Sequence, residues 1–182
     1  MASSVQTLSE GDRRLVAAWA VACVERVLWL YDTENPGDDR PRAAIARTRA
    51  FSLGELDTRS GIRQRFGGGS INRKTQSPAA TAAAKAAGQA SAICHMGAHA
   101  LGAAAYAVKA ASLAAPGRPE VAKDEISWQL AQMTPDVAAA LRSLPPIGKD
   151  RSGPLGPGLL ATGQIAAIIR QLQACLGRTD AP

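Results

Sequence analysis

The chain has 182 residues, enough for one domain with its own core, and 46% of them are apolar, which excludes an intrinsically disordered protein. Aromatic residues make up only 4%, so we expect a core of alanine and aliphatic side chains in closely packed helices. The formal net charge of +6 is scattered along the chain and is not clustered with stacking aromatic residues, so a nucleic-acid-binding surface is not expected.

The first part of the chain predicts two helices joined by a tight turn. Apolar residues at helical spacing predict a helix over about 10–32, with Ser9 as its N-cap. Asn35-Pro36-Gly37 breaks that pattern. The segment 38–42, with two aspartates and a proline, is typical of a helix start, and the second helix is expected to end near residue 53.

The middle of the chain changes abruptly from basic and glycine-rich to alanine-rich. A short helix over 56–66 is expected, and the basic stretch 59–74 should be a mobile loop. From Ser77-Pro78 to about Leu113, the composition predicts one long central helix, with Gly88 or Gly97 as the place for a kink.

The last part of the chain predicts helices over 119–132 and 135–144, a linker rich in proline and glycine over 145–158, and an amphipathic helix over 159–177. No segment alternates with the period of two that a strand requires. The predicted fold class is therefore all-α: a compact bundle of about six to seven helices around the long alanine-rich helix, without a sheet. We expect a core domain over 8–144, with the C-terminal helix packing on it or on a partner subunit of a homo-oligomer.

Both histidines of the chain lie in the alanine-rich stretch, four residues apart. On a continuous helix His95 and His99 would share one face, which is the spacing of helical metal ligands. Met96 stands where a zinc protease motif has its glutamate, and Cys94 would point away from His95. We therefore expect structural histidines hydrogen-bonded between helices, without a bound metal or cofactor. The alternative is a small-molecule or metal site at His95 and His99. If that site is catalytic, the protein is expected to be a hydrolase or an isomerase that uses the two imidazoles.

The three cysteines are Cys23, Cys94 and Cys175, an odd number with no CxxC pair. This usage indicates reduced thiols in an intracellular protein. Residues 1–11 are polar and lack the apolar region of a signal peptide, and no segment is a clear membrane span. We expect a cytoplasmic protein with no membrane partner.

Charged residues follow one another from Glu25 and Arg26 through the first turn into the second predicted helix. The plain interpretation is helix capping with interhelical ion pairs, and the functional one is a polar recognition surface on the first helical hairpin. No phosphate-binding loop and no nucleophile elbow occurs, so no catalytic residue is assigned. The candidate polar site, functional or structural, comprises Glu25, Arg26, Asp39, Arg40, Arg42, His95, His99 and Tyr106.

Three sequence blocks occur in a distinctive order: AAWAVACVERVL at 17–28, DDRPRAAIARTRAFSLGE at 38–55 and AAGQASAICHMGAHALGAAAYAVKA at 86–110. Together they resemble the bacterial Imm-5-like putative immunity proteins over about residues 8–130. The chain departs from the family pattern at 57–77, where a glycine-rich basic loop replaces a further alanine-rich helix. The family motifs fall on Trp19, Cys23, Glu25, Arg26, Asp39, Arg40, Pro41, Arg42, His95, His99, Gly102 and Tyr106.

The resemblance implies an all-helical cytosolic protein that neutralises a toxin or bacteriocin by binding it. We therefore expect a non-enzymatic immunity protein whose partner is a cognate protein toxin and whose mechanism is occlusion of the toxin. The expected surface is the charged edge of the first hairpin together with the loop 59–74, facing an anionic toxin. Nucleic-acid binding through that loop is a third, weaker hypothesis.

Overall fold

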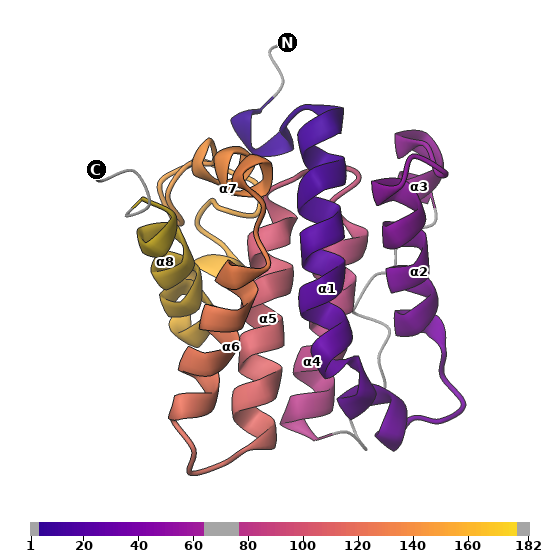
Figure 1. The fold of residues 1–182 in the computed structure, drawn as a ribbon, viewed down its shortest axis with the longest axis vertical. Coiled ribbons are helices and arrows are strands. Elements are labelled where there is room, and N and C mark those ends of the chain that lie inside the picture. The colour runs from indigo at the N-terminus through magenta and orange to yellow at the C-terminus, as the bar shows by residue number, and fades with distance from the viewer. Residues whose placement is uncertain (1–3, 64–76, 178–182) are drawn as a thin grey trace.

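A computed structural model describes residues 4–63 and 77–177, and this part of the chain contains eight α-helices and no strand (Figure 1). The prediction of an all-α bundle without a sheet is confirmed for these residues. The helices are α1 (Glu10–Glu34), α2 (Arg40–Ser52), α3 (Thr58–Arg63), α4 (Pro78–Ser91), α5 (His99–Ala114), α6 (Glu120–Ala131), α7 (Pro135–Arg142) and α8 (Gly163–Gly177).

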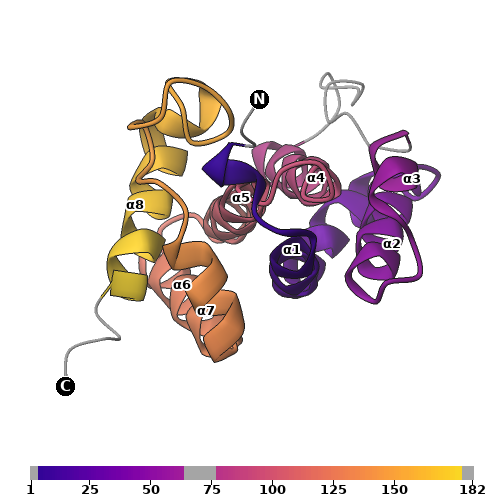
Figure 2. The same ribbon diagram turned by 90° about the horizontal axis from the view of Figure 1, so that it is seen from above.

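The bundle is built around α1, α4 and α5, which pack on one another at its centre. On one side α2 covers α1 and α4, and on the other side α6, α7 and α8 pack against α5, α1 and each other (Figures 1 and 2). The buried faces of α4 and α5 consist largely of alanine, including Ala83, Ala87, Ala104 and Ala107, each with 0% exposure. Such small side chains allow the helices to pack at short distance.

The ends of the first two helices follow their sequence signals closely. Ser9 caps α1, because its side-chain oxygen accepts a hydrogen bond from the N–H of Asp12 at 3.0 Å. At the start of α2, Asp39 occupies the N-cap position without a side-chain cap bond, and Asp38 accepts from the N–H of Arg40 at 3.1 Å instead. After α2 ends, Gly54 adopts a φ of +82°, the left-handed conformation that favours glycine.

The expectation of one long helix over 77–113 is wrong. The chain leaves its helical path after Ser91 and begins α5 at His99, so that α4 and α5 form an antiparallel hairpin (Figure 1). A continuous helix of this length, at about 1.5 Å per residue, would be roughly 55 Å long. It would extend beyond the neighbouring helices and expose much of its alanine surface, whereas the hairpin buries that surface between its two arms.

The turn between α4 and α5 is held by the N-terminal segment of the chain. The N–H of Gly97 donates to the carbonyl of Thr7 at 3.1 Å, and the N–H of Ala98 donates to the carbonyl of Gln6 at 3.0 Å. Gly97 also lies against Leu8, whose Cδ1 would be 2.5 Å from a Cβ at position 97. Tertiary contacts therefore take the N–H groups that a continuous helix would have used.

The C-terminal helix begins later than expected. The stretch Leu159–Ala161 forms a 3-10 turn, and α8 starts at Gly163. Its apolar side, with Ile169 and Leu172 fully buried, packs on α5 and α7 of the same chain. Exchange of this helix between subunits stays a prediction. Most of the expected basic loop 59–74 lies outside the described residues, which include only α3 from it.

Candidate functional site

A surface groove of about 410 Å³ runs between α1 and α2 on the outer side of the first helical hairpin. The two helices are antiparallel, joined by the turn at 35–39, and α2 lies at the edge of the bundle (Figures 1 and 2). The groove takes residues from the second half of α1, from α2 and from the turn that follows α2. We call this surface the α1–α2 groove.

Two large apolar side chains in the α1–α2 groove face solvent. Trp29 of α1 is 59% exposed, and Leu53 at the end of α2 is 66% exposed. Burying such side chains is favourable, and tryptophan is among the residue types that dominate binding energy in protein interfaces. Exposed apolar side chains that share one groove are typical of a protein-binding surface.

Ion pairs that join the two helices flank these apolar side chains. Arg49 contacts Glu25 at 2.5 Å, and Arg42 contacts Asp32. A third acidic residue, Glu55, also lines the groove and makes no ion pair with a residue in the described ranges. The groove thus combines apolar side chains with three acidic and two basic residues, and it is not basic as the whole chain is.

The turn that leads into α2 carries a tight polar cluster. The hydroxyl of Tyr31 donates to Asp38 at 2.6 Å, and Arg40 contacts the same carboxylate at 2.6 Å. Arg40, together with the smaller effect of Tyr31, holds the pKa of Asp38 well below its usual range. Asp39 is exposed beside this cluster. The hydrogen bonds keep the turn, and therefore the start of α2, in one conformation.

Arg26 does not face the α1–α2 groove. It pairs with Glu125 of α6 at 3.0 Å, and its guanidinium lies 4.0 Å from the centre of the Trp128 ring. The side chain of Glu125 is only 5% exposed, so the carboxylate of this ion pair is buried where α1 meets α6. Its role in the described structure is to hold two helices together.

The structure does not bring the two histidines onto a shared helical face. His95 is exposed in the turn between α4 and α5, whereas His99 begins α5 and contacts Gln89 of α4, Nδ1 to Oε1, at 2.8 Å. The contact of His99 joins α4 to α5. Tyr106 is buried further along α5, with the ammonium of Lys85 5.7 Å from its ring centre, and burial raises the pKa of the Tyr106 hydroxyl.

The described residues contain no cluster of side chains suited to hold a metal ion, and the thiol of Cys23 is buried. Among them, no three histidine, cysteine or acidic side chains lie close enough to hold a metal ion. Burial raises the pKa of the Cys23 thiol well above its ordinary value, which keeps the sulfur protonated. None of the described helices has the length and apolar character needed to cross a bilayer.

The eight sequence-predicted site residues therefore fall into separate places. Glu25 and Arg42 line the α1–α2 groove, Asp39 is the N-cap of α2, and Arg40 is the first residue of α2. The other four lie at the contact of α1 with α6 and along the α4–α5 hairpin. The sequence analysis did not name Trp29 or Leu53 as candidates. Trp29 falls outside the helical spacing of the buried residues of α1, and this position could have indicated that its side chain is exposed.

Comparison with known proteins supplies the family. No curated protein and no solved structure matches the chain. The model of the family described as Imm-5 like putative immunity protein matches residues 6–136, which extend from the N-terminal turn to the first residues of α7 and include the whole α1–α2 groove. Since this match covers well over half of the chain, the protein belongs to the Imm-5 like putative immunity protein family.

Proposed function

We propose that this protein neutralises a cognate bacterial toxin in the cytoplasm by binding it through the α1–α2 groove and covering the toxin's working surface. The observation that carries the proposal is the exposure of Trp29 and Leu53 within one groove, inside the region that matches the family. An immunity protein of this kind needs no chemistry of its own, because steric occlusion is sufficient to stop a toxin from reaching its substrate.

The groove indicates what the toxin surface should look like. An apolar side chain of the toxin would pack against Trp29 and Leu53, where both proteins lose exposed apolar area. Around it, the acidic and basic groups of Glu25, Arg49 and Glu55 favour a rim that carries both signs of charge. This differs from the uniformly anionic toxin face that the net charge of the chain predicts.

The test first looks for a toxin domain among the genes that neighbour this one, and then measures whether the protein protects a bacterial host that expresses that domain. Wild-type protein should restore growth, and purified protein should inhibit the toxin at a one-to-one ratio. Trp29→Ala should weaken the complex by about 2 kcal/mol or more, roughly thirtyfold in Kd, because it removes the largest apolar contact. Leu53→Ser should weaken the complex in the same direction.

Leu159→Ser is the matched control, because Leu159 is 67% exposed and lies outside the α1–α2 groove. It removes as much exposed leucine surface as Leu53→Ser and should leave protection intact. All three variants should keep the wild-type melting temperature, since the replaced side chains are exposed. The proposal fails if the two groove variants protect the host as well as the wild-type protein does.

A further inference from the structure

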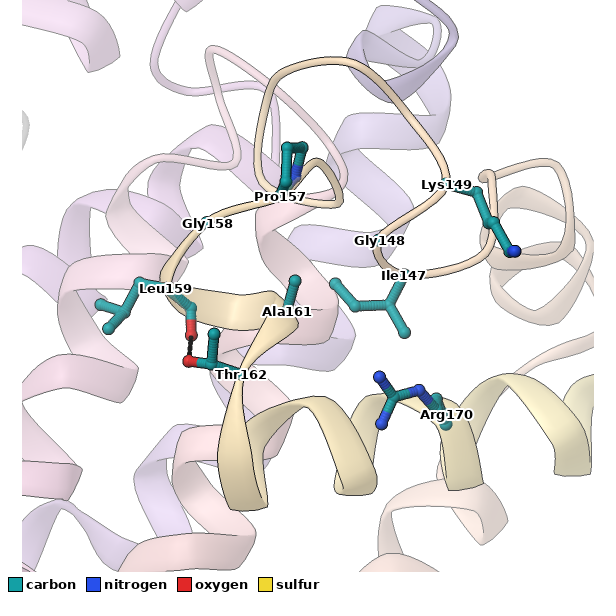
Figure 3. A pocket seen from close by; sticks show the side chains of 9 residues that line it. All are labelled: Ile147, Gly148, Lys149, Pro157, Gly158, Leu159, Ala161, Thr162 and Arg170. Atoms are coloured by element: carbon teal, nitrogen blue, oxygen red, sulfur yellow. Dashed lines mark hydrogen bonds between the residues drawn. The ribbon is translucent and has the colours of Figure 1, made fainter.

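A second recess lies on the far side of the bundle from the α1–α2 groove, between α8 and the segment that precedes it. Its volume is about 930 Å³, and residues 147–149, 157–159, 161–162 and Arg170 line it (Figure 3). The volume is in the range of small-molecule sites. Because the family match ends at residue 136, nothing in that match assigns a role to this recess. We call it the α8 pocket.

The walls of the α8 pocket are held in place although their sequence is rich in proline and glycine. The N–H of Gly148 donates to the carbonyl of Leu155 at 2.7 Å, which ties the two arms of the segment together. The N–H of Ile147 donates to Gln173 of α8 at 3.1 Å, and the side chain of Gln173 donates to the carbonyl of Pro145 at 3.0 Å. A pocket with such fixed walls loses little conformational entropy when a ligand binds.

The pocket combines an apolar wall with two basic side chains. Ile147, Pro157 and Ala161 contribute apolar surface, and Leu159, although large and apolar, is 67% exposed at the rim. Arg170 points from α8 toward Ile147, whereas the side chains of Lys149 and Leu159 extend away from Ile147 on opposite sides (Figure 3). Within the described part of the chain, no acidic residue lines the recess.

Neither basic side chain has its charge balanced within the described ranges. Lys149 and Arg170 make no ion pair there. The adjacent Asp150 is engaged elsewhere, because it accepts hydrogen bonds from the side chain of Gln6 at 2.6 Å and from the N–H of Arg151 at 2.7 Å. The pocket therefore presents positive charge beside an apolar surface.

We infer that the α8 pocket binds an amphiphilic anion, a small molecule with one carboxylate or phosphate head group on an apolar body. The head group would meet the guanidinium of Arg170 through charge-assisted hydrogen bonds, and the Lys149 side chain would turn toward the head group to add a second positive charge. The apolar body would cover Ile147, Pro157 and Ala161 and remove their surface from water. This inference is independent of the proposed toxin binding, because it uses other residues on another side of the bundle.

The experiment titrates the full chain with decanoate and with decyl phosphate, each below its micelle-forming concentration, by isothermal titration calorimetry. At least one of them should bind at one site per chain, and amide NMR shifts should locate it at residues 147–162. Decyltrimethylammonium, which has the same tail with a cationic head, should not bind there. Inorganic phosphate alone should bind far more weakly than decyl phosphate, because it lacks the tail.

Charge-removing variants complete the test. Lys149→Gln with Arg170→Gln should weaken binding about tenfold or more, through loss of the charge-assisted hydrogen bonds. Arg59→Gln with Lys123→Gln changes the net charge equally at two exposed positions elsewhere and should leave binding unchanged. The inference is overturned if neither anionic probe binds, if the cationic probe binds as well, or if the Lys149 and Arg170 variant retains wild-type affinity.

Discussion

Among individual residues, burial decides how much each ion pair contributes to stability. Glu125 has a 5% exposed side chain and is held by Arg26, whereas the pair of Arg118 with Glu120 has side chains 66% and 50% exposed. A buried carboxylate that loses its partner keeps the cost of desolvation, but an exposed one is solvated by water. The sequence shows all four charges and does not show this difference.

Arg26→Ala should lower the free energy of unfolding by about 2 kcal/mol, because it leaves Glu125 without its cation and removes the contact with the Trp128 ring. Urea denaturation would measure the change. Arg118→Ala is the matched control, and its free energy of unfolding should stay close to that of the wild-type protein. Equal effects of the two substitutions would show that the Arg26 pair is worth no more than a surface pair.

Trp29 makes a related point about candidate functional residues. Trp29 does not fall at the helical spacing of the buried residues of α1, which indicates that its side chain is exposed. Only the packing of α2 beside α1 shows that Leu53 lies in the same groove. Of the charged residues that line the groove, the sequence analysis names Glu25 and Arg42, which belong to the run of charges across the first turn, and it does not name Arg49 or Glu55. The apolar members were not predictable together, because the leucine comes from a turn more than 20 residues later.

At the scale of elements, most helices follow local signals, and the exceptions are where distant segments intervene. The starts of α1 and α7 coincide with the capping residues Ser9 and Thr134. The turn between α4 and α5 has a weaker signal, Gly97, because the alanines on either side of it favour a helix. It exists because the N-terminal segment supplies hydrogen-bond acceptors and the side chain of Leu8 at that point.

Gly97→Ala should therefore destabilise the protein, by about 2 kcal/mol, because the new methyl group would overlap Cγ as well as Cδ1 of Leu8. Thermal or urea unfolding would measure this loss. The substitution should cost less in a Leu8→Ala background, where the space is already open. Gly11→Ala serves as the control, since a Cβ at position 11 would meet only an ordinary contact with Ser9. This substitution should stabilise α1 slightly, because alanine favours a helix more than glycine does. A loss of the same size at both glycines would contradict the proposed overlap.

At the scale of the whole molecule, Gln6 connects the N-terminal part of the chain to the segment 150–155, which precedes α8. This residue is 1% exposed, and its side chain accepts from the N–H of Leu155 at 2.9 Å and donates to the carbonyl of Ser152 at 2.7 Å. A side chain added to Gly153, whose φ is +76°, would overlap Gln6. The N-terminal turn thus supports both the α4–α5 turn and the segment before α8.

Gln6→Ala should lower the free energy of unfolding by about 2 kcal/mol, because the buried N–H of Leu155 loses its acceptor. Hydrogen exchange should show faster exchange at Leu155 and Gly148 than in the wild-type protein. Gln171→Ala, at an exposed position of α8, should change neither quantity. Unaltered exchange at Leu155 in the Gln6 variant would show that other contacts hold this segment.

The sequence by itself determined the helical class and the positions of most helices, because composition, capping residues and helical spacing are local properties. The family followed from the resemblance of three sequence blocks to its members. Only the tertiary structure decided that the alanine-rich stretch folds back on itself, that the histidines do not share a face, and that Trp29 and Leu53 meet in one groove. Each of these outcomes depends on contacts between residues far apart in the chain. Their energies arise from packing and desolvation, which no local pattern records.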